Sequence, residues 1–70
     1  MNRVPVVSSN IRSVGYDESS ETLEIEFTSG SIYQYFDVPE SEYKRLINAA
    51  SKGRYFNQNI KESYRYVQIR

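Results

Sequence analysis

The sequence alternates apolar and acidic residues over Thr22-Leu23-Glu24-Ile25-Glu26-Phe27-Thr28. Successive side chains of a β-strand point to opposite faces of the sheet, so this period of two predicts a strand with Leu23, Ile25 and Phe27 on the core side. The two glutamates between them would then lie on a face open to water. The rest of the expected fold extends from this strand in both directions.

Two further strands are expected beside it. Residues 11–16 carry β-branched and aromatic side chains, and the polar run 17–21 suits the turn of a hairpin. Residues 31–36 form another aromatic and β-branched run after the segment 28–30. Three strands joined in this way make an antiparallel meander.

The loop before the third strand decides which of its side chains face the core. Glycine adopts the left-handed conformation that ends a three-residue hairpin loop, so Gly30 favours a loop that places Tyr33 and Tyr35 beside the apolar side chains of the preceding strand. A two-residue turn at 29–30 would instead place Ile32, Gln34 and Phe36 there. We favour the three-residue loop, which leaves apolar side chains on the opposite face and suggests that this face is partly covered.

Two helices are expected after the meander. Pro39 and the carboxylates that follow it suit the first turn of a helix, whose sheet-facing side is formed by residues at i, i+3, i+4 and i+7: Tyr43, Leu46, Ile47 and Ala50. Ser51 suits the N-cap of a second, shorter helix that runs through Tyr55 and Phe56 towards Ile60. The tail, residues 64–69, could form a final strand or lie extended along the domain.

These elements predict an α+β domain. We expect a three- or four-stranded antiparallel meander, with one main helix and a shorter second helix packed on one face, over residues 8–70. Residues 1–7 are expected to be a flexible N-terminal segment. A chain of 70 residues has room for one small core, and without cysteine that core must be held by apolar packing, to which ten aromatic residues contribute. No apolar run is long enough for a membrane span or a signal peptide, so we expect a cytoplasmic protein with no membrane partner.

The charges divide the chain into two halves although the net charge is zero. Residues 13–43 contain eight acidic residues and no lysine or arginine, whereas residues 44–70 contain seven cations opposed only by Glu62. This asymmetry could mean an anion-binding face, or it could mean that the two halves attract each other across the fold.

Short motifs follow one another in a definite order over about residues 8–66. They are Ser8-Ser9-Asn10-Ile11, Val14-Gly15-Tyr16-Asp17, Leu23-Glu24-Ile25-Glu26-Phe27, Gly30, Tyr33-Gln34-Tyr35, Val38-Pro39, Ala50-Ser51-Lys52-Gly53, Tyr55-Phe56-Asn57 and Ile60. This series resembles the KTSC domain family, which is marked by a central Tyr-x-Tyr. The family is named after the C-terminal end of certain lysyl-tRNA synthetases and also occurs as free-standing small proteins. The resemblance implies a domain of uncharacterised function for which RNA binding is proposed from the synthetase context.

The residue types present do not favour catalysis. Without histidine or cysteine the chain lacks the commonest general base and the usual zinc ligands, so we expect a noncatalytic protein with no catalytic residues, no cofactor and no metal. Two carboxylate pairs, Glu24 with Glu26 and Glu40 with Glu42, are interpreted as solvated and helix-capping groups rather than as an acid–base or divalent-ion site. The family motif residues Tyr33 and Tyr35 are spaced as rings that stack on bases, but we favour a structural role for both in the core.

The basic and aromatic segment 52–66 is the better candidate for a binding site. It combines cations for phosphates, rings for stacking and an amide for base edges; the candidate nucleic-acid-binding residues are Lys52, Arg54, Tyr55, Asn57, Lys61, Tyr64, Arg65 and Tyr66. Our first hypothesis is weak, salt-sensitive binding of RNA or single-stranded nucleic acid. The alternative is a module that binds a protein partner or a second copy of itself through an exposed sheet edge.

Overall fold

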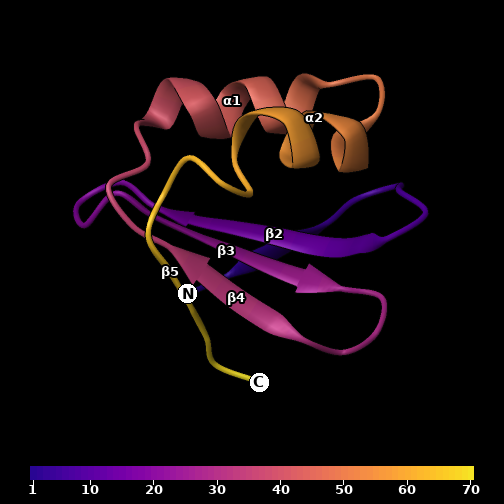
Figure 1. Ribbon diagram of the computed structural model, residues 1–70, viewed down its shortest axis with the longest axis horizontal. Helices are drawn as coiled ribbons and strands as arrows, with labels where there is room; N and C mark the ends of the chain where they lie inside the picture. The colour runs from indigo at the N-terminus through magenta and orange to yellow at the C-terminus, as the bar shows by residue number, and fades with distance from the viewer.

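The computed structural model describes residues 1–70 as an antiparallel sheet with two helices on one of its faces (Figure 1). The strands are β1 (Arg3–Pro5), β2 (Ile11–Asp17), β3 (Thr22–Phe27), β4 (Ile32–Tyr35) and β5 (Tyr66–Gln68), and the helices are α1 (Glu40–Asn48) and α2 (Lys52–Asn59). The order in the sheet follows the chain, β1-β2-β3-β4-β5, and both helices lie between β4 and β5 in sequence. The α+β class is confirmed, with five strands instead of three or four. Neither helix is long and apolar enough to cross a membrane.

The hairpin of β2 and β3 forms as expected. Val14 lies opposite Ile25 on the core side, and the next pair on that side is Tyr16 with Leu23. The carboxylate of Asp17 closes the turn, because it accepts hydrogen bonds from the hydroxyls of Ser19 and Ser20 at 3.0 and 2.7 Å. A short polar side chain at the strand end therefore fixes where the chain reverses.

The loop between β3 and β4 has the three-residue form. The amide of Phe27 donates to the carbonyl of Ser31, and the amide of Gly30 donates back to Phe27, both at 2.9 Å. Gly30 has a φ of 97°, a conformation in which a side chain would be strained. Tyr33 therefore lies opposite Ile25 and Tyr35 opposite Leu23, so the favoured register is confirmed.

The N-terminal segment differs from the expectation. Residues 1–7 were expected to be flexible, whereas Arg3–Pro5 forms the edge strand β1 against β2. Arg3 lies opposite Gly15, and a Cβ atom on Gly15 would be 3.0 Å from Cγ of Arg3. Because Gly15 has no side chain, the arginine extends across it and forms an ion pair with Glu24 on the next strand. This contact, which no local pattern predicts, anchors β1.

The second face of the sheet was expected to be open to water, but it is largely buried. Glu24 and Glu26 are 5% and 9% exposed. Glu26 accepts a hydrogen bond from Ser13 at 2.8 Å and pairs with three arginines: Arg3 at 3.9 Å, Arg12 at 3.6 Å and Arg70 at 3.4 Å. Buried carboxylates require such partners, and arginines from both ends of the chain supply them here.

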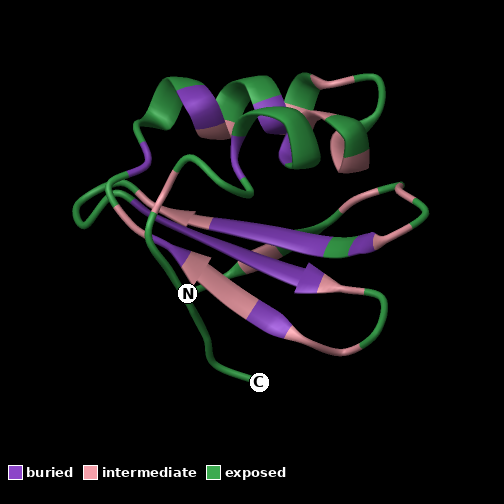
Figure 2. Ribbon diagram, viewed as in Figure 1, coloured by how far each residue is buried: buried purple, intermediate pink, exposed green.

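The core lies between the other face of the sheet and the helices (Figure 2). Its buried members are Ile11, Val14, Leu23, Ile25, Tyr35, Val38, Leu46, Phe56 and Ile60.

Polar side-chain contacts hold the two helices in place. Ser51 caps α2 as expected, since its hydroxyl accepts from the amide of Arg54 at 3.3 Å. The Tyr55 hydroxyl donates to Glu42 at 3.1 Å and joins α2 to α1.

The two halves of the charge pattern do attract each other in part. Two ion pairs join residues 13–43 to the C-terminal tail, Arg65 with Asp37 at 3.2 Å and Arg70 with Glu26 at 3.4 Å. Two others lie within α1 and join residues of the acidic and basic stretches that are neighbours on the helix. Much of the basic half is therefore neutralised within the fold.

Replacing Tyr35 by alanine should unfold the protein or bring it close to unfolding. The ring is 3% exposed and packs on Phe56, so its loss should cost about 3–5 kcal/mol, a large part of the stability of a small domain. Tyr64→Ala, which removes a half-buried ring near the surface, is the control and should stay folded. Urea unfolding followed by circular dichroism measures both; a Tyr35→Ala variant as stable as the parent would contradict the described packing.

Acid should weaken the second face of the sheet. The hydrogen bond from Ser13, followed by the neighbouring arginines, lowers the pKa of the Glu26 carboxyl from its ordinary value of 4.5. A carboxyl with a lowered folded-state pKa stabilises the fold above its unfolded pKa, and this contribution is lost as the pH falls through the folded value. Glu26→Gln should therefore lower the urea midpoint at neutral pH and reduce the further loss of stability below about pH 4.5. Glu18→Gln, in the exposed β2–β3 turn, should leave the pH profile unchanged.

Candidate functional site

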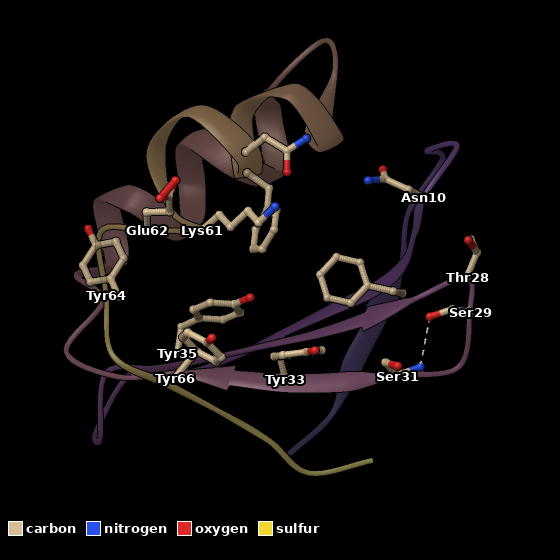
Figure 3. A pocket seen from close by; sticks show the side chains of 13 residues that line it. Asn10, Thr28, Ser29, Ser31, Tyr33, Tyr35, Lys61, Glu62, Tyr64 and Tyr66 are labelled. Carbon is tan, nitrogen blue, oxygen red and sulfur yellow. Dashed lines mark hydrogen bonds between the residues drawn. The ribbon is translucent and has the colours of Figure 1, made fainter.

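A cleft of about 810 Å³ opens between the sheet and the end of α2 (Figure 3). We call it the aromatic cleft; it is lined by Asn10, Phe27, Thr28, Ser29, Ser31, Tyr33, Tyr35, Phe56, Asn57, Lys61, Glu62, Tyr64 and Tyr66. Its lining comes from the loop before β2, the end of β3 with the loop that follows, β4, the start of β5, and α2 with the chain after it. Segments far apart in sequence therefore form one concave surface.

Four aromatic rings pack in a closed circuit around the inner part of the cleft. The distances between ring centroids are 5.6 Å for Phe27 and Tyr33, 6.3 Å for Tyr33 and Tyr35, 5.4 Å for Tyr35 and Phe56, and 5.4 Å for Phe56 and Phe27. Tyr66 lies outside this circuit, with its ring 5.8 Å from Tyr33 and 5.7 Å from Tyr35. Such contacts fix the rings in place, which gives the cleft a preformed aromatic surface.

The two family tyrosines are covered to different extents. We expected both to have a structural role in the core. Phe56 of α2 packs on Tyr35 from the helix side, and Tyr35 is 3% exposed whereas Tyr33 is only half-buried. Tyr35 is thus part of the core, as the structural interpretation predicted, and Tyr33 packs against the core while presenting part of its ring to the cleft.

The Tyr35 hydroxyl is a polar group at the inner end of an aromatic site. It makes no hydrogen bond within the protein, in contrast to the hydroxyls of Tyr16, Tyr33 and Tyr55, which donate to Val38, Gln68 and Glu42. Figure 3 shows it directed into the space between the sheet and α2. Burial raises the pKa of Tyr35, so this group is a neutral hydroxyl at physiological pH and can both donate and accept.

Polar side chains surround the opening of the cleft. Asn10 reaches it from the loop before β2, where its amide oxygen accepts a hydrogen bond from Ser8 at 3.2 Å. α2 can approach this side chain because its second residue is Gly53, at which a Cβ atom would lie 2.4 Å from the Asn10 amide oxygen. Asn10 and Asn57 also line a second, fully polar hollow of about 510 Å³, whose other lining residues are Ser9, Ser51, Gly53, Arg54 and Gln58. The aromatic cleft and this polar hollow are therefore neighbours.

The structure brings together half of the predicted binding residues. Asn57, Lys61, Tyr64 and Tyr66 line the aromatic cleft, and Arg54 lines the polar hollow. Three predicted residues make structural contacts elsewhere. Tyr55 joins the two helices, Lys52 donates to the carbonyl of Ala49 at 3.2 Å, and Arg65 pairs with Asp37 and lies over the Phe36 ring at 5.8 Å.

Three cations have no carboxylate partner. Six of the nine lysines and arginines form ion pairs, and the remaining three are Lys52, Arg54 and Lys61. All three belong to α2 or to the residues directly after it. Unpaired positive charge is therefore concentrated on the element that forms one wall of the aromatic cleft.

Sequence reasoning did not identify Asn10 and Phe27 as site residues. Phe27 carries the alternation of a core strand, and its place at the strand end, next to the cleft, follows from the register and the loop. Asn10 belongs to a polar segment before the first predicted strand, and its position depends on the close approach of Gly53. Two motifs quoted for the family resemblance contain these residues, Ser8-Ser9-Asn10 and Ala50-Ser51-Lys52-Gly53. Nothing in either motif indicated that the two segments contact each other.

Comparison with known proteins adds a family and a solved structure. Residues 7–64 match the model of the KTSC domain. An uncharacterized protein of Stutzerimonas stutzeri is 47% identical over 70 residues, which cover 99% of each chain. The crystal structure of a KTSC domain protein from Yersinia pestis superimposes with a TM-score of 0.96 at 42% identity, covering 99% of this chain and 97% of the other.

A second kind of relative is much longer. A lysine–tRNA ligase of Nostoc punctiforme is 46% identical over 59 residues, which are 84% of this chain but 10% of the ligase. A ligase of another Nostoc strain matches over the same length at the same identity. The similarity therefore covers one small segment of these enzymes.

Proposed function

Since this chain belongs to the KTSC domain family, whose members include segments of lysine–tRNA ligases, we propose that it is a noncatalytic domain that binds single-stranded RNA at the aromatic cleft. The observation that carries the proposal is the cleft itself, in which partly exposed rings lie beside amide side chains and an unpaired lysine. Rings stack on bases, amides bond to base edges and cations bind phosphates, so the three groups required for single-strand recognition are present together.

The charge distribution supports a strand that follows α2. Lys61 lies at the aromatic cleft and Arg54 at the polar hollow, and Lys52 is at the start of the same helix. Phosphates of a strand crossing both surfaces would meet these three cations, none of which is held in an ion pair, although Glu62 beside Lys61 also lines the cleft. Stacking on partly exposed rings requires unpaired bases, which favours a single strand over a duplex.

The affinity should be low. The net charge is zero and six of the nine cations are neutralised within the fold, so few counterions are released when RNA binds. The context of the longer relatives is consistent with a weak accessory site. Their name identifies enzymes that act on tRNA, and a similar segment forms a tenth of one of them.

The triple variant Lys52→Ala, Arg54→Ala and Lys61→Ala should lose RNA binding and remain folded. Fluorescence anisotropy of a labelled single-stranded RNA at low salt measures binding, and for the parent we expect the affinity to fall steeply as salt is added. Lys61→Ala and Lys44→Ala form a matched pair of single variants, because both remove an exposed lysine but Lys44 lies on α1 near Glu40. Equal binding by these two variants, or no binding by the parent at low salt, would contradict the proposal.

A protein-interaction module is the second candidate, favoured by the edges of the sheet. β1 and β5 are the two edge strands, and both expose apolar side chains, with Val4 54% and Val67 43% exposed, while Ile69, directly after β5, is 50% exposed. Unpaired edge groups of this kind can accept another strand. This surface requires none of the cations on α2.

Sedimentation at high salt separates the two candidates. A module of the second kind should form a complex with itself or with a partner that persists at high salt, because strand pairing and apolar contact are little affected by screening. Val67→Lys should abolish that complex by placing a charge on the edge strand, and it should leave RNA binding unchanged. If the protein is monomeric and binds no partner at high salt, the protein-interaction function is ruled out.

A further inference from the structure

We propose that the aromatic cleft receives one unpaired base of the bound strand and that the Tyr35 hydroxyl makes a hydrogen bond to the edge of this base. The inference rests on the proposed function and specifies how the strand is recognised. It starts from a contrast within the core. Tyr35 is 3% exposed and is surrounded by rings, yet its hydroxyl is not used by the protein.

Two tyrosines that pack against the core use their hydroxyls within the fold. Tyr16 donates to the carbonyl of Val38 at 2.6 Å, and Tyr55 donates to Glu42 at 3.1 Å. A phenylalanine at position 35 would fill the same space without a polar atom that needs a partner. The Tyr35 hydroxyl is therefore available to a polar group that enters the cleft.

The oxygen of Tyr35 is accessible to such a group. No buried side-chain oxygen or nitrogen in the protein lacks a hydrogen-bond partner, so the unbonded Tyr35 oxygen is in contact with the open cleft. Figure 3 shows the hydroxyl of Tyr35 directed into the space between the sheet and α2, a space that Lys61 lines from the residues directly after this helix. A planar ligand inserted along the rings would reach this hydroxyl with its edge.

The surrounding surface fits a base better than an aliphatic group. The partly exposed rings of Tyr33 and Tyr66 offer π-faces inclined at 45° with centroids 5.8 Å apart, and Asn57 adds an amide to the lining. The edge of a base carries donors and acceptors that a hydroxyl and an amide can meet together. The volume of about 810 Å³ admits a base with its ribose, and it lies within the range of about 300–1,000 Å³ that is typical of small-ligand sites.

The position of Lys61 indicates where the phosphate of the inserted nucleotide lies relative to its base. Lys61 lines the same cleft from the helix side, opposite the tyrosines of the sheet (Figure 3). With the base against the sheet rings, its phosphate would lie at the opening near this lysine. The next nucleotide would then meet the polar hollow, where Arg54 is the second unpaired cation.

The test compares a five-nucleotide single-stranded RNA with an abasic ribose-phosphate chain of the same length. Removing the bases should weaken binding to the parent protein about tenfold or more, because stacking supplies much of the affinity of a single strand. Tyr35→Phe should weaken binding of the base-bearing RNA roughly 3- to 10-fold and should not change binding of the abasic chain. Tyr43→Phe is the matched control, since Tyr43 stacks on Tyr16 outside the cleft, and it should bind like the parent.

Two further measurements distinguish a loss of base binding from a loss of the fold. Tyr35→Phe should unfold at the same temperature as the parent, because the hydroxyl makes no bond within the protein. In the parent itself, the ring proton signals of Tyr33 and Tyr35 should shift in NMR spectra when the RNA is added and stay in place with the abasic chain. Binding of both chains with equal affinity, or RNA binding that Tyr35→Phe does not weaken, would overturn base insertion and leave RNA binding standing. No binding of either chain at low salt would overturn both.

Discussion

The register between β3 and β4 is the constraint on which the rest of the structure depends. The three-residue loop that ends at Gly30 places Tyr33 and Tyr35 on the same side as Leu23 and Ile25. A slip of one residue would move both rings to the face of the buried glutamates. Phe56 would then lose its packing on Tyr35, and the aromatic cleft would not form. One glycine conformation therefore decides the position of the core and of the candidate site.

The opposite face shows how a small sheet can bury charge without a second helical layer. Glu24 and Glu26 are satisfied by Ser13, Gln34 and arginines from the two chain ends. Such a network is costly to break because an unpaired buried carboxylate loses its water without compensation. It also ties both termini to the central strand, so edge strands of three residues each remain attached to the sheet.

The candidate site follows from incomplete cover of the aromatic face. α1 and α2 close the core over Tyr35, to which α2 contributes Phe56, but the rings of Tyr33 and Tyr66 stay partly exposed. The same short helix and the residues directly after it carry all three cations that have no carboxylate partner. Aromatic surface and unpaired charge therefore meet at one end of the sheet, which is the combination that single-stranded nucleic acids require.

The sequence by itself determined the α+β class, the meander and the two helices and favoured the observed register, because alternation, glycine position and capping residues act over a few neighbouring positions. Motif order was sufficient to identify the family. Only the tertiary structure decided that Glu24 and Glu26 are buried in ion pairs, that β1 pairs with β2, and which predicted site residues meet. Those outcomes depend on contacts between distant segments, such as Arg3 crossing Gly15 and Asn10 meeting Gly53, and such contacts leave no periodic signal in a single chain.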